Sequence, residues 1–237
     1  CLFMLVPFAL VLRQPDLGTA LVFAAIAFSM FWVCGFKMKW IAALAGAFVC
    51  VAPVLWRFLH EYQKNRIRVF LDPELDPFGA GYHVIQSKIA IGSGGVFGRG
   101  FLHGTQSHYQ FLPEQSTDFI FSILAEEWGF IGGFAVFFLY LVIKIGRASC
   151  RERVMLRTVY IIRATNNTYG HYIASGILGM FFFHFVVNTG MVMGIMPITG
   201  IPLLFLSYGG SSLWTAMICT GLLMSINYRR YDFSESM

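Results

Sequence analysis

The sequence contains a stretch of 65 residues, positions 164–228, without a single Asp, Glu, Lys or Arg. An α-helix rises about 1.5 Å per residue, so roughly 20 apolar residues cross a bilayer core about 30 Å thick. The stretch is therefore long enough for two membrane spans, and Pro197 and Pro202 divide it. We expect the two helices at about residues 172–193 and 211–227.

Three more apolar windows precede this stretch, at residues 17–35, 40–59 and 119–143, and residues 1–12 form a shorter one that ends at Arg13. Only 12% of the residues are charged, against about 25% in soluble domains. The sequence therefore predicts an all-α, polytopic membrane protein with about five complete transmembrane helices and a partial one at the N-terminus. We expect residues 1–237 to form a single membrane domain. Because the chain starts inside an apolar run without a methionine, we interpret it as a fragment.

Lysine and arginine collect in cytoplasmic loops, so their positions predict the orientation of the helices. The basic residues that mark the cytoplasmic side are Lys37, Lys39, Lys144, Arg157, Arg163, Arg229 and Arg230. Alternation then places the large loop at residues 60–118 and the turn at residues 193–210 outside, and the C-terminus inside. The net charge of +5 comes from short basic segments between apolar runs, so no nucleic-acid partner is expected.

Residues 145–154 differ from everything around them, because they place three arginines within ten positions. This decapeptide resembles one translated frame of a common sequencing-library adapter. We interpret it as an assembly artefact in a cytoplasmic loop, which leaves open whether its two flanks derive from one gene.

The extracytoplasmic loop holds two elements that could contact a substrate. Val84, Ile85, Lys88 and Ile91 recur at helical spacing, which predicts an amphipathic helix lying at the membrane interface. Residues 92–100, which follow, include five glycines. Glycines at this density let the backbone approach a ligand phosphate, but they suit a flexible connector equally well.

Asp118 is the last charged residue before an apolar window, and Glu114 lies four residues earlier. A carboxylate at such a boundary is partly desolvated, which makes it a better proton acceptor. The alternative interpretation is a charge at a helix N-terminus, with Thr117 or Asp118 as the cap.

Glu126 and Glu127 would lie roughly 12 Å into the same span if residues 119–143 form one helix. Ionisable groups at that depth usually face a polar cavity or a partner, so the pair is a functional candidate. A buried hydrogen bond that fixes helix packing is the alternative. We expect His184 to be a packed side chain. His103 and His108 have no further metal-ligating residues at a suitable spacing, so we expect no histidine metal site.

Several segments in the same order resemble the SEDS proteins (shape, elongation, division and sporulation), a family of bacterial peptidoglycan glycosyltransferases. The segments are residues 13–19 (RQPDLGT), 71–82, 86–95 (QSKIAIGSGG), 104–107 (GTQS), 112–120, 188–191 (NTGM) and 207–211 (SYGGS). The residues of these segments are closer to those of the elongation members of the family than to those of the division members. The family has ten spans, so the resemblance implies that the fragment lacks the first four.

The resemblance implies an inverting enzyme that polymerises lipid II into glycan strands during cell elongation and cell-shape maintenance. The family's essential aspartate corresponds to Asp118, its acidic neighbour to Glu114 and its loop lysine to Lys88. A departing pyrophosphate needs positive charge, which Lys88 or Arg66 could supply. The further substrate-binding candidates are Gln106, Ser107, Thr117, Glu126 and Ser207.

The resemblance also implies a multi-pass protein of the bacterial inner membrane, in contact with membrane lipid, whose large loop faces the periplasm. The implied partner is a class B penicillin-binding protein. No cofactor is certain, and a divalent cation, Mg or Mn, stays open. The main rival function is a lipid II flippase, because acidic residues within a span and glycine or proline breaks near residues 197–210 also suit a transporter. We expect the fragment alone to be inactive.

Overall fold

The computed structural model describes residues 2–14, 16–35, 60–77, 79–104, 117–142 and 168–232, with a few isolated positions between 39 and 57 and Ile162. Every regular element in these ranges is helical, which confirms the predicted all-α class. The elements are α1 Leu2–Arg13, α2 Leu17–Val33, α4 Glu61–Leu71, the short 3₁₀ helix η1 Pro73–Leu75, α5 Ala80–Gly94, α7 Ile120–Val142, α9 Thr168–Val192 and α10 Gly210–Asp232. The span predicted at residues 40–59 lies almost wholly outside the described residues, and so does the decapeptide at 145–154.

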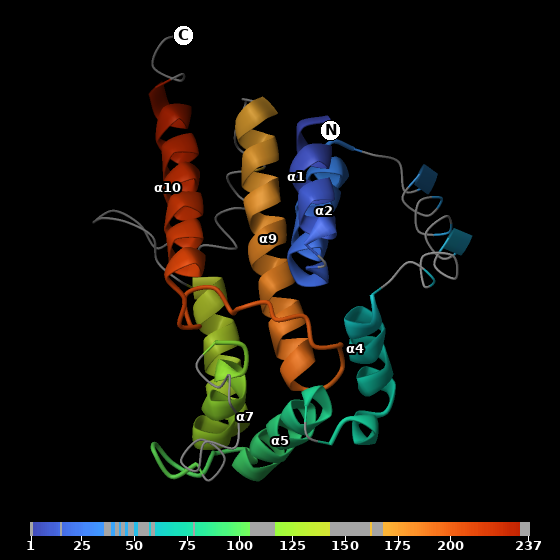
Figure 1. Ribbon diagram of the computed structural model, residues 1–237. Helices are drawn as coiled ribbons and strands as arrows, with labels where there is room; N and C mark the ends of the chain where they lie inside the picture. Colours follow the sequence, from blue (N-terminus) through green and yellow to red (C-terminus); the bar gives the residue numbers. More distant parts are fainter. Residues whose placement is uncertain are drawn as a thin grey trace.

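Helices α1, α2, α9 and α10 run side by side, with the start of α1 and the end of α10 at the same end (Figure 1). The spans predicted at 17–35, 172–193 and 211–227 correspond to α2, α9 and α10. At the opposite end, the connection between α1 and α2 meets the turn that follows α9. A Cβ atom at Gly18 would lie 2.5 Å from the carbonyl oxygen of Thr199. The α1–α2 connection therefore shares one end of the bundle with the turn after α9, which the charge pattern predicts outside.

The contact between α2 and α9 depends on small residues. A Cβ atom at Gly179 would lie 2.3 Å from Ser29 Oγ, and one at Gly176 would lie 3.3 Å from a methyl group of Ile26. Glycines on one helix let the backbone of the other approach closely, which is a common way of packing helices in membranes. Around this contact Val22, Ala174, Ile177, Phe181 and other side chains form a buried apolar core.

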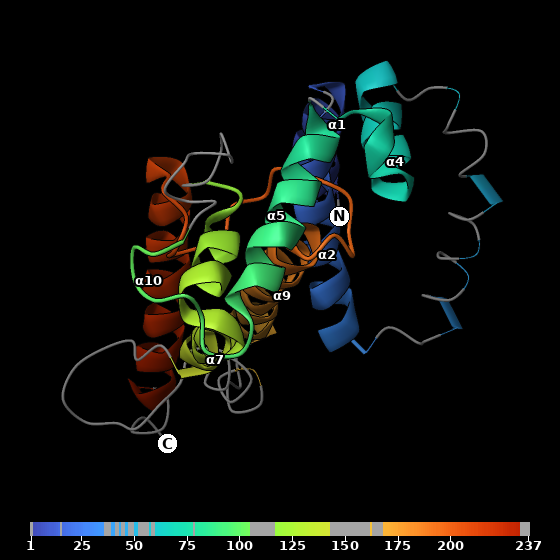
Figure 2. The same ribbon diagram turned by 90° about the horizontal axis from the view of Figure 1, so that it is seen from below.

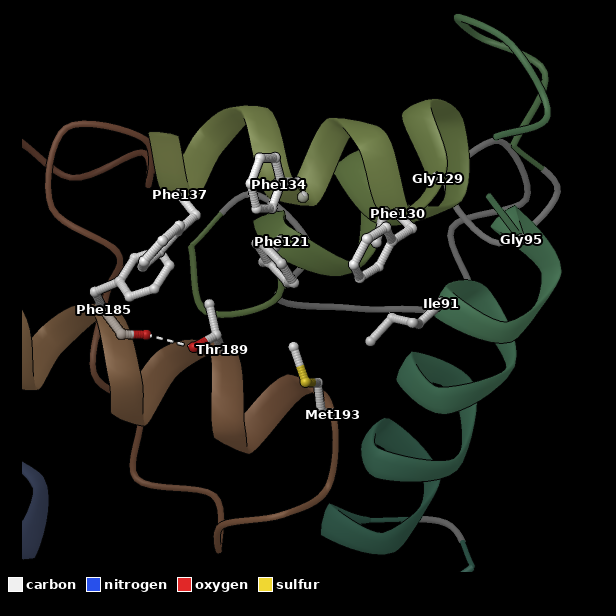
Figure 3. Close-up of a pocket in the computed structure, with 12 residues that line it drawn as sticks. Ile91, Gly95, Phe121, Gly129, Phe130, Phe134, Phe137, Phe185, Thr189 and Met193 are labelled. Carbon is white, nitrogen blue, oxygen red and sulfur yellow. Dashed lines mark hydrogen bonds between the residues drawn. The ribbon is translucent and has the colours of Figure 1, made fainter. Parts of the chain in front are cut away.

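Helix α7 is not one continuous span. Gly129 has φ 65° and ψ −160°, a backbone conformation that lies outside the helical region. The ring of Phe121 lies so near Gly133 that a Cβ atom there would be 3.2 Å from Phe121 Cζ. In a straight helix these two residues would be about 18 Å apart along the axis. The chain therefore doubles back at Gly129, and Figure 3 shows Phe121 beside Phe134 with Gly129 beyond both of them.

This hairpin corrects the prediction of a single span at residues 119–143. The first arm runs from Ile120 to the glycine, and the second arm returns towards the start of α10, where the Tyr140 hydroxyl donates to the Leu204 carbonyl. By length and composition two helices of the described residues could cross a membrane, Ile120–Tyr140 and Thr168–Val192. Of these, α9 is continuous, whereas α7 reverses in the middle of its segment.

Helix α5 lies across the end of the bundle, where the turn after α9 also lies, and α4 stands beside it (Figures 1 and 2). Helix α5 includes the helix predicted from the spacing of Val84, Ile85, Lys88 and Ile91. Ser87 connects it to both neighbouring helices. The Ser87 hydroxyl donates to the Val192 carbonyl at 2.7 Å, and it lies 3.0 Å from the hydroxyl of Ser122.

Candidate functional site

Asp118 lies at the foot of the α7 hairpin, where the first arm starts. The side-chain amide of Asn188, in α9, donates to the Asp118 backbone carbonyl at 2.9 Å and to the Ile201 carbonyl at 2.8 Å. Asn188 is fully buried. One amide thus joins three segments of the chain: α9, the start of α7 and the turn after α9.

The turn after α9 forms one wall beside the Asp118 side chain. A Cβ atom at Gly200 would be 3.6 Å from Asp118 Oδ2, so the carboxylate lies against the backbone of this glycine. On the other side of the turn is the N-terminus of α2, where the Asp16 carboxylate accepts hydrogen bonds from the N–H group of Thr19 at 3.2 Å and from its hydroxyl at 2.6 Å. The segment RQPDLGT, recognised in the sequence, therefore lies next to the turn that borders Asp118.

Lys88 lies at the same end of α9. Its side chain crosses Gly194, where a Cβ atom would be 2.0 Å from Lys88 Cε and 2.7 Å from Nζ. Gly194 has φ 70°, a conformation that favours glycine. The residue before Lys88 is Ser87, whose hydrogen bond to Val192 fixes this part of α5 on α9. The structure thus holds Lys88 and Asp118 around the last two turns of α9.

The glycine-rich segment 92–100 pairs with the backbone of α7, a role that differs from both predictions, a phosphate-binding loop and a flexible connector. Its N–H groups at Arg99 and Gly100 donate to the Glu126 and Glu127 carbonyls, both at 3.0 Å. Its carbonyls at Gly95 and Val96 accept from the N–H groups of Phe130 and Ile131, at 2.9 and 3.2 Å. These four bonds satisfy backbone groups that the break at Gly129 deprives of helical partners. The amides of Arg99 and Gly100 are therefore occupied and do not form a phosphate cradle.

Glu126 and Glu127 precede the reversal at Gly129. They end the first arm of the hairpin, beside residues 99 and 100, because the chain turns back at Gly129. Both residues are buried, and Glu126 has no exposed surface.

Two other candidates take part in local contacts. The Arg66 guanidinium lies 4.5 Å from the centre of the Tyr62 ring and donates to its hydroxyl, both within α4. The Ser207 hydroxyl accepts from the Leu203 N–H group at 2.7 Å, which closes the turn before α10. Thr117 precedes Asp118 and is half-buried. Glu114, Gln106 and Ser107 lie outside the described residues.

His184 is a packed residue, as expected, since its Nδ1 lies 2.9 Å from the Pro202 carbonyl. The described ranges contain no group of three His, Cys, Asp or Glu side chains that could hold a metal ion. An apolar pocket of about 330 Å³ lies between α5, α7 and α9 (Figure 3). Its one polar lining side chain, Thr189, already donates to the Phe185 carbonyl at 2.7 Å. The pocket therefore suits apolar groups rather than sugars or phosphates.

Sequence reasoning missed the importance of Asn188, Gly194 and Gly200. Asn188 belongs to a segment that carried the family resemblance, but no role followed from it. The available signal was an amide inside a long apolar helix, because such a polar group needs partners on neighbouring segments. The glycines at 194 and 200 gave no local signal, since their neighbours Lys88 and Asp118 are more than 80 residues away in the chain.

An all-helical bundle with a membrane-length apolar helix, and with a carboxylate held where several helix ends meet, defines a helical membrane protein. The chain belongs to the cell cycle protein family of FtsW, RodA and SpoVE, which matches residues 1–232. This confirms the resemblance to the SEDS proteins.

Two curated relatives and one solved structure illustrate the similarity. The chain is 65% identical to the peptidoglycan glycosyltransferase RodA of Treponema pallidum over 174 residues, which cover 73% of this chain and 38% of that protein. It is 43% identical to the peptidoglycan glycosyltransferase MrdB of Escherichia coli over 232 residues, which cover 98% of this chain and 60% of that protein. The chain thus spans 38% to 60% of the length of these relatives.

The fold matches a chain from a peptidoglycan synthase complex that coordinates polymerization and crosslinking. The TM-score is 0.74 at 35% identity, and the match covers 97% of this chain and 61% of that one. The helices described above are therefore arranged largely as in that chain.

Proposed function

We propose that the protein to which this chain belongs is a peptidoglycan glycosyltransferase, which polymerises lipid II during cell elongation and cell-shape maintenance. The observation that carries the proposal is the position of Asp118, whose backbone is held by Asn188 and whose carboxylate lies against Gly200. Two relatives named as peptidoglycan glycosyltransferases support the choice of reaction.

In the proposed reaction, the 4-hydroxyl of an acceptor sugar attacks the anomeric carbon of a lipid-linked donor. A sugar hydroxyl is a poor nucleophile at neutral pH, so the Asp118 carboxylate takes its proton as the new carbon–oxygen bond forms. The bond from the anomeric carbon to the pyrophosphate oxygen breaks, undecaprenyl pyrophosphate leaves, and the configuration is inverted. Asp118 is thus the general base.

The leaving pyrophosphate needs positive charge, and Lys88 is the better candidate. The Arg66 guanidinium is engaged by Tyr62, and the amides of Arg99 and Gly100 are bonded to α7. Glu114, Gln106, Ser107, Thr117, Glu126 and Ser207 stay substrate-binding candidates from the sequence.

The same proposal includes a location and a partner. We place the protein in the bacterial inner membrane as a multi-pass protein. The loop at 60–118 faces the periplasm and the C-terminus the cytoplasm. The proposed partner is a class B penicillin-binding protein, and the similarity to a chain of a synthase complex that couples polymerization to crosslinking supports it.

The test is polymerisation of labelled lipid II by the purified full-length protein. Glycan ladders are expected from the unchanged protein, and they should vanish in Asp118→Asn, which keeps the shape of the side chain but cannot accept the proton. A folded Asp118→Asn protein that still makes ladders would refute the general-base role. Movement of lipid II across vesicles without any polymer, unaffected by this substitution, would favour the flippase.

A further inference from the structure

Asn188 lies one helical turn from the end of α9 and has no exposed surface. Its side-chain NH₂ group makes two hydrogen bonds, to the backbone carbonyls of Asp118 and Ile201. These partners are 70 and 13 residues away in the chain. An amide is suited to this task because its two N–H groups diverge and can reach two acceptors at once.

The hydrogen bond from Asn188 to Asp118 holds the backbone just before the start of α7. Asp118 precedes the first residue of α7, Ile120, and the Ser122 N–H group donates to Phe119 rather than to Asp118. The Asp118 carbonyl is therefore held by a side chain of α9. A rotation of this peptide group would swing the carboxylate away from Gly200, against which its Oδ2 atom lies.

The bond to Ile201 fixes the other side of the same site. Gly200 precedes Ile201, so the amide that holds the Ile201 carbonyl also holds the turn that borders the carboxylate. The rest of the first hairpin arm is fixed separately, by Ser87 at Ser122 and by the glycine-rich segment at Glu126 and Glu127. Asn188 thus controls the end of the arm that carries the acid.

We infer that Asn188 is a positioning residue, which sets the orientation of the Asp118 carboxylate relative to the turn at Gly200 and thereby controls the rate of glycosyl transfer. The inference rests on the proposed function. Asn188 touches no reacting atom in this arrangement, and its effect passes through the backbone of Asp118. A misplacement of about 1 Å at a reacting group can lower a rate about 100-fold.

The experiment compares two substitutions in the full-length protein. Asn188→Leu keeps the number and branching of the side-chain heavy atoms, is moderately larger, and removes both N–H donors without adding charge. It also removes Asn188 Oδ1, a buried atom without a partner, so part of the stability lost with the two bonds is recovered. The matched control is Ser175→Ala in the same helix, where the buried hydroxyl donates only to the Tyr172 carbonyl one turn away.

We expect Asn188→Leu to lower kcat about 10- to 100-fold per folded molecule, with KM for lipid II within about threefold of the unchanged protein. Ser175→Ala should keep both constants. If Asn188→Leu does not fold, Asn188→Ala, which removes the same donors without adding charge or bulk, takes its place.

A kcat within about twofold of the unchanged protein, or a loss confined to KM, would overturn the inference. The two proposals fail separately. Ladders that survive Asp118→Asn refute the general-base role, whereas ladders that vanish in Asp118→Asn and persist at full rate in Asn188→Leu refute only the positioning role.

Discussion

The ring of Phe121 lies against the backbone of Gly133, although twelve residues separate them within one apolar segment. This contact requires that the chain reverse at Gly129. Because of this reversal, Asp118 lies at one end of the first arm of the hairpin and Glu126 near the other. The contacts that stabilise the hairpin and its surroundings can be tested.

The hairpin itself can be tested by crosslinking. Cysteines introduced as Phe121→Cys and Gly133→Cys, in a background without the natural cysteines, should be joined by a short bifunctional thiol reagent. Proteolysis between the two positions, followed by electrophoresis, would detect the joined fragments. In a straight helix the pair would be about 18 Å apart and beyond such a reagent. Failure to crosslink, while each single cysteine is labelled, would contradict the hairpin.

The glycine-rich segment should tolerate substitution at one glycine and not at another. A Cβ atom at Gly98 would lie 2.1 Å from the Glu127 carbonyl oxygen, and Gly98 has φ 79°. We expect Gly98→Ala to cost about 2 kcal/mol or more, because the segment must leave α7 or adopt a strained backbone. Thermal unfolding in detergent measures this. Gly92→Ala, in α5 with nothing within 4 Å of the added carbon, is the control and should be neutral or stabilising.

Gly194 should matter through Lys88 more than through its own backbone. In Gly194→Ala the added carbon would meet Lys88 Cε at 2.0 Å, so the side chain must move away. We expect polymerisation to fall nearly as far as in Lys88→Ala. Gly35→Ala is the matched control, because Gly35 has a similar φ of 74° but nothing within 4 Å.

The control variant should lose only about 1 kcal/mol of stability from backbone strain. The comparison of the two alanines therefore separates contact from strain. Equal rates of polymerisation in Gly194→Ala and Gly35→Ala would show that displacing Lys88 has no effect on the reaction.

Ser87 and Ser122 should show energetic coupling. Their hydroxyls are 3.0 Å apart, and both residues have no exposed surface. In a double-mutant cycle of Ser87→Ala and Ser122→Ala, unfolding free energies should reveal a coupling of about 0.5 to 1.5 kcal/mol. Ser93→Ala, whose hydroxyl donates within α5 to the Ala90 carbonyl at 2.8 Å, should not couple to Ser122→Ala. Strict additivity of the first pair would contradict the contact.

Much of the helical framework was predictable from the order of the residues alone. Apolar runs bounded by charged residues or by prolines predicted α1, α2, α9 and α10, because a segment that enters a bilayer must bury its backbone polar groups within its own hydrogen bonds. The spacing of Val84, Lys88 and Ile91 predicted α5 for a similar local reason. Asp118 was recognisable as the acid at the border of an apolar window.

The α7 hairpin was not predictable in this way. Residues 119–143 have the composition of a span, and Gly129 is one glycine among several in that segment. The chain reverses there because a second segment, residues 95–100, supplies the four hydrogen bonds that the break leaves open. The same reversal puts Glu126 and Glu127 at the end of the first arm, beside residues 99 and 100.

The sequence by itself determined the helical class and the positions of most helices, because both depend on neighbouring residues and on the solvent around them. The tertiary structure decided which segments surround Asp118. Hydrogen bonds such as the one from Asn188 to Asp118 join residues 70 positions apart, and they exist only after the helices have packed.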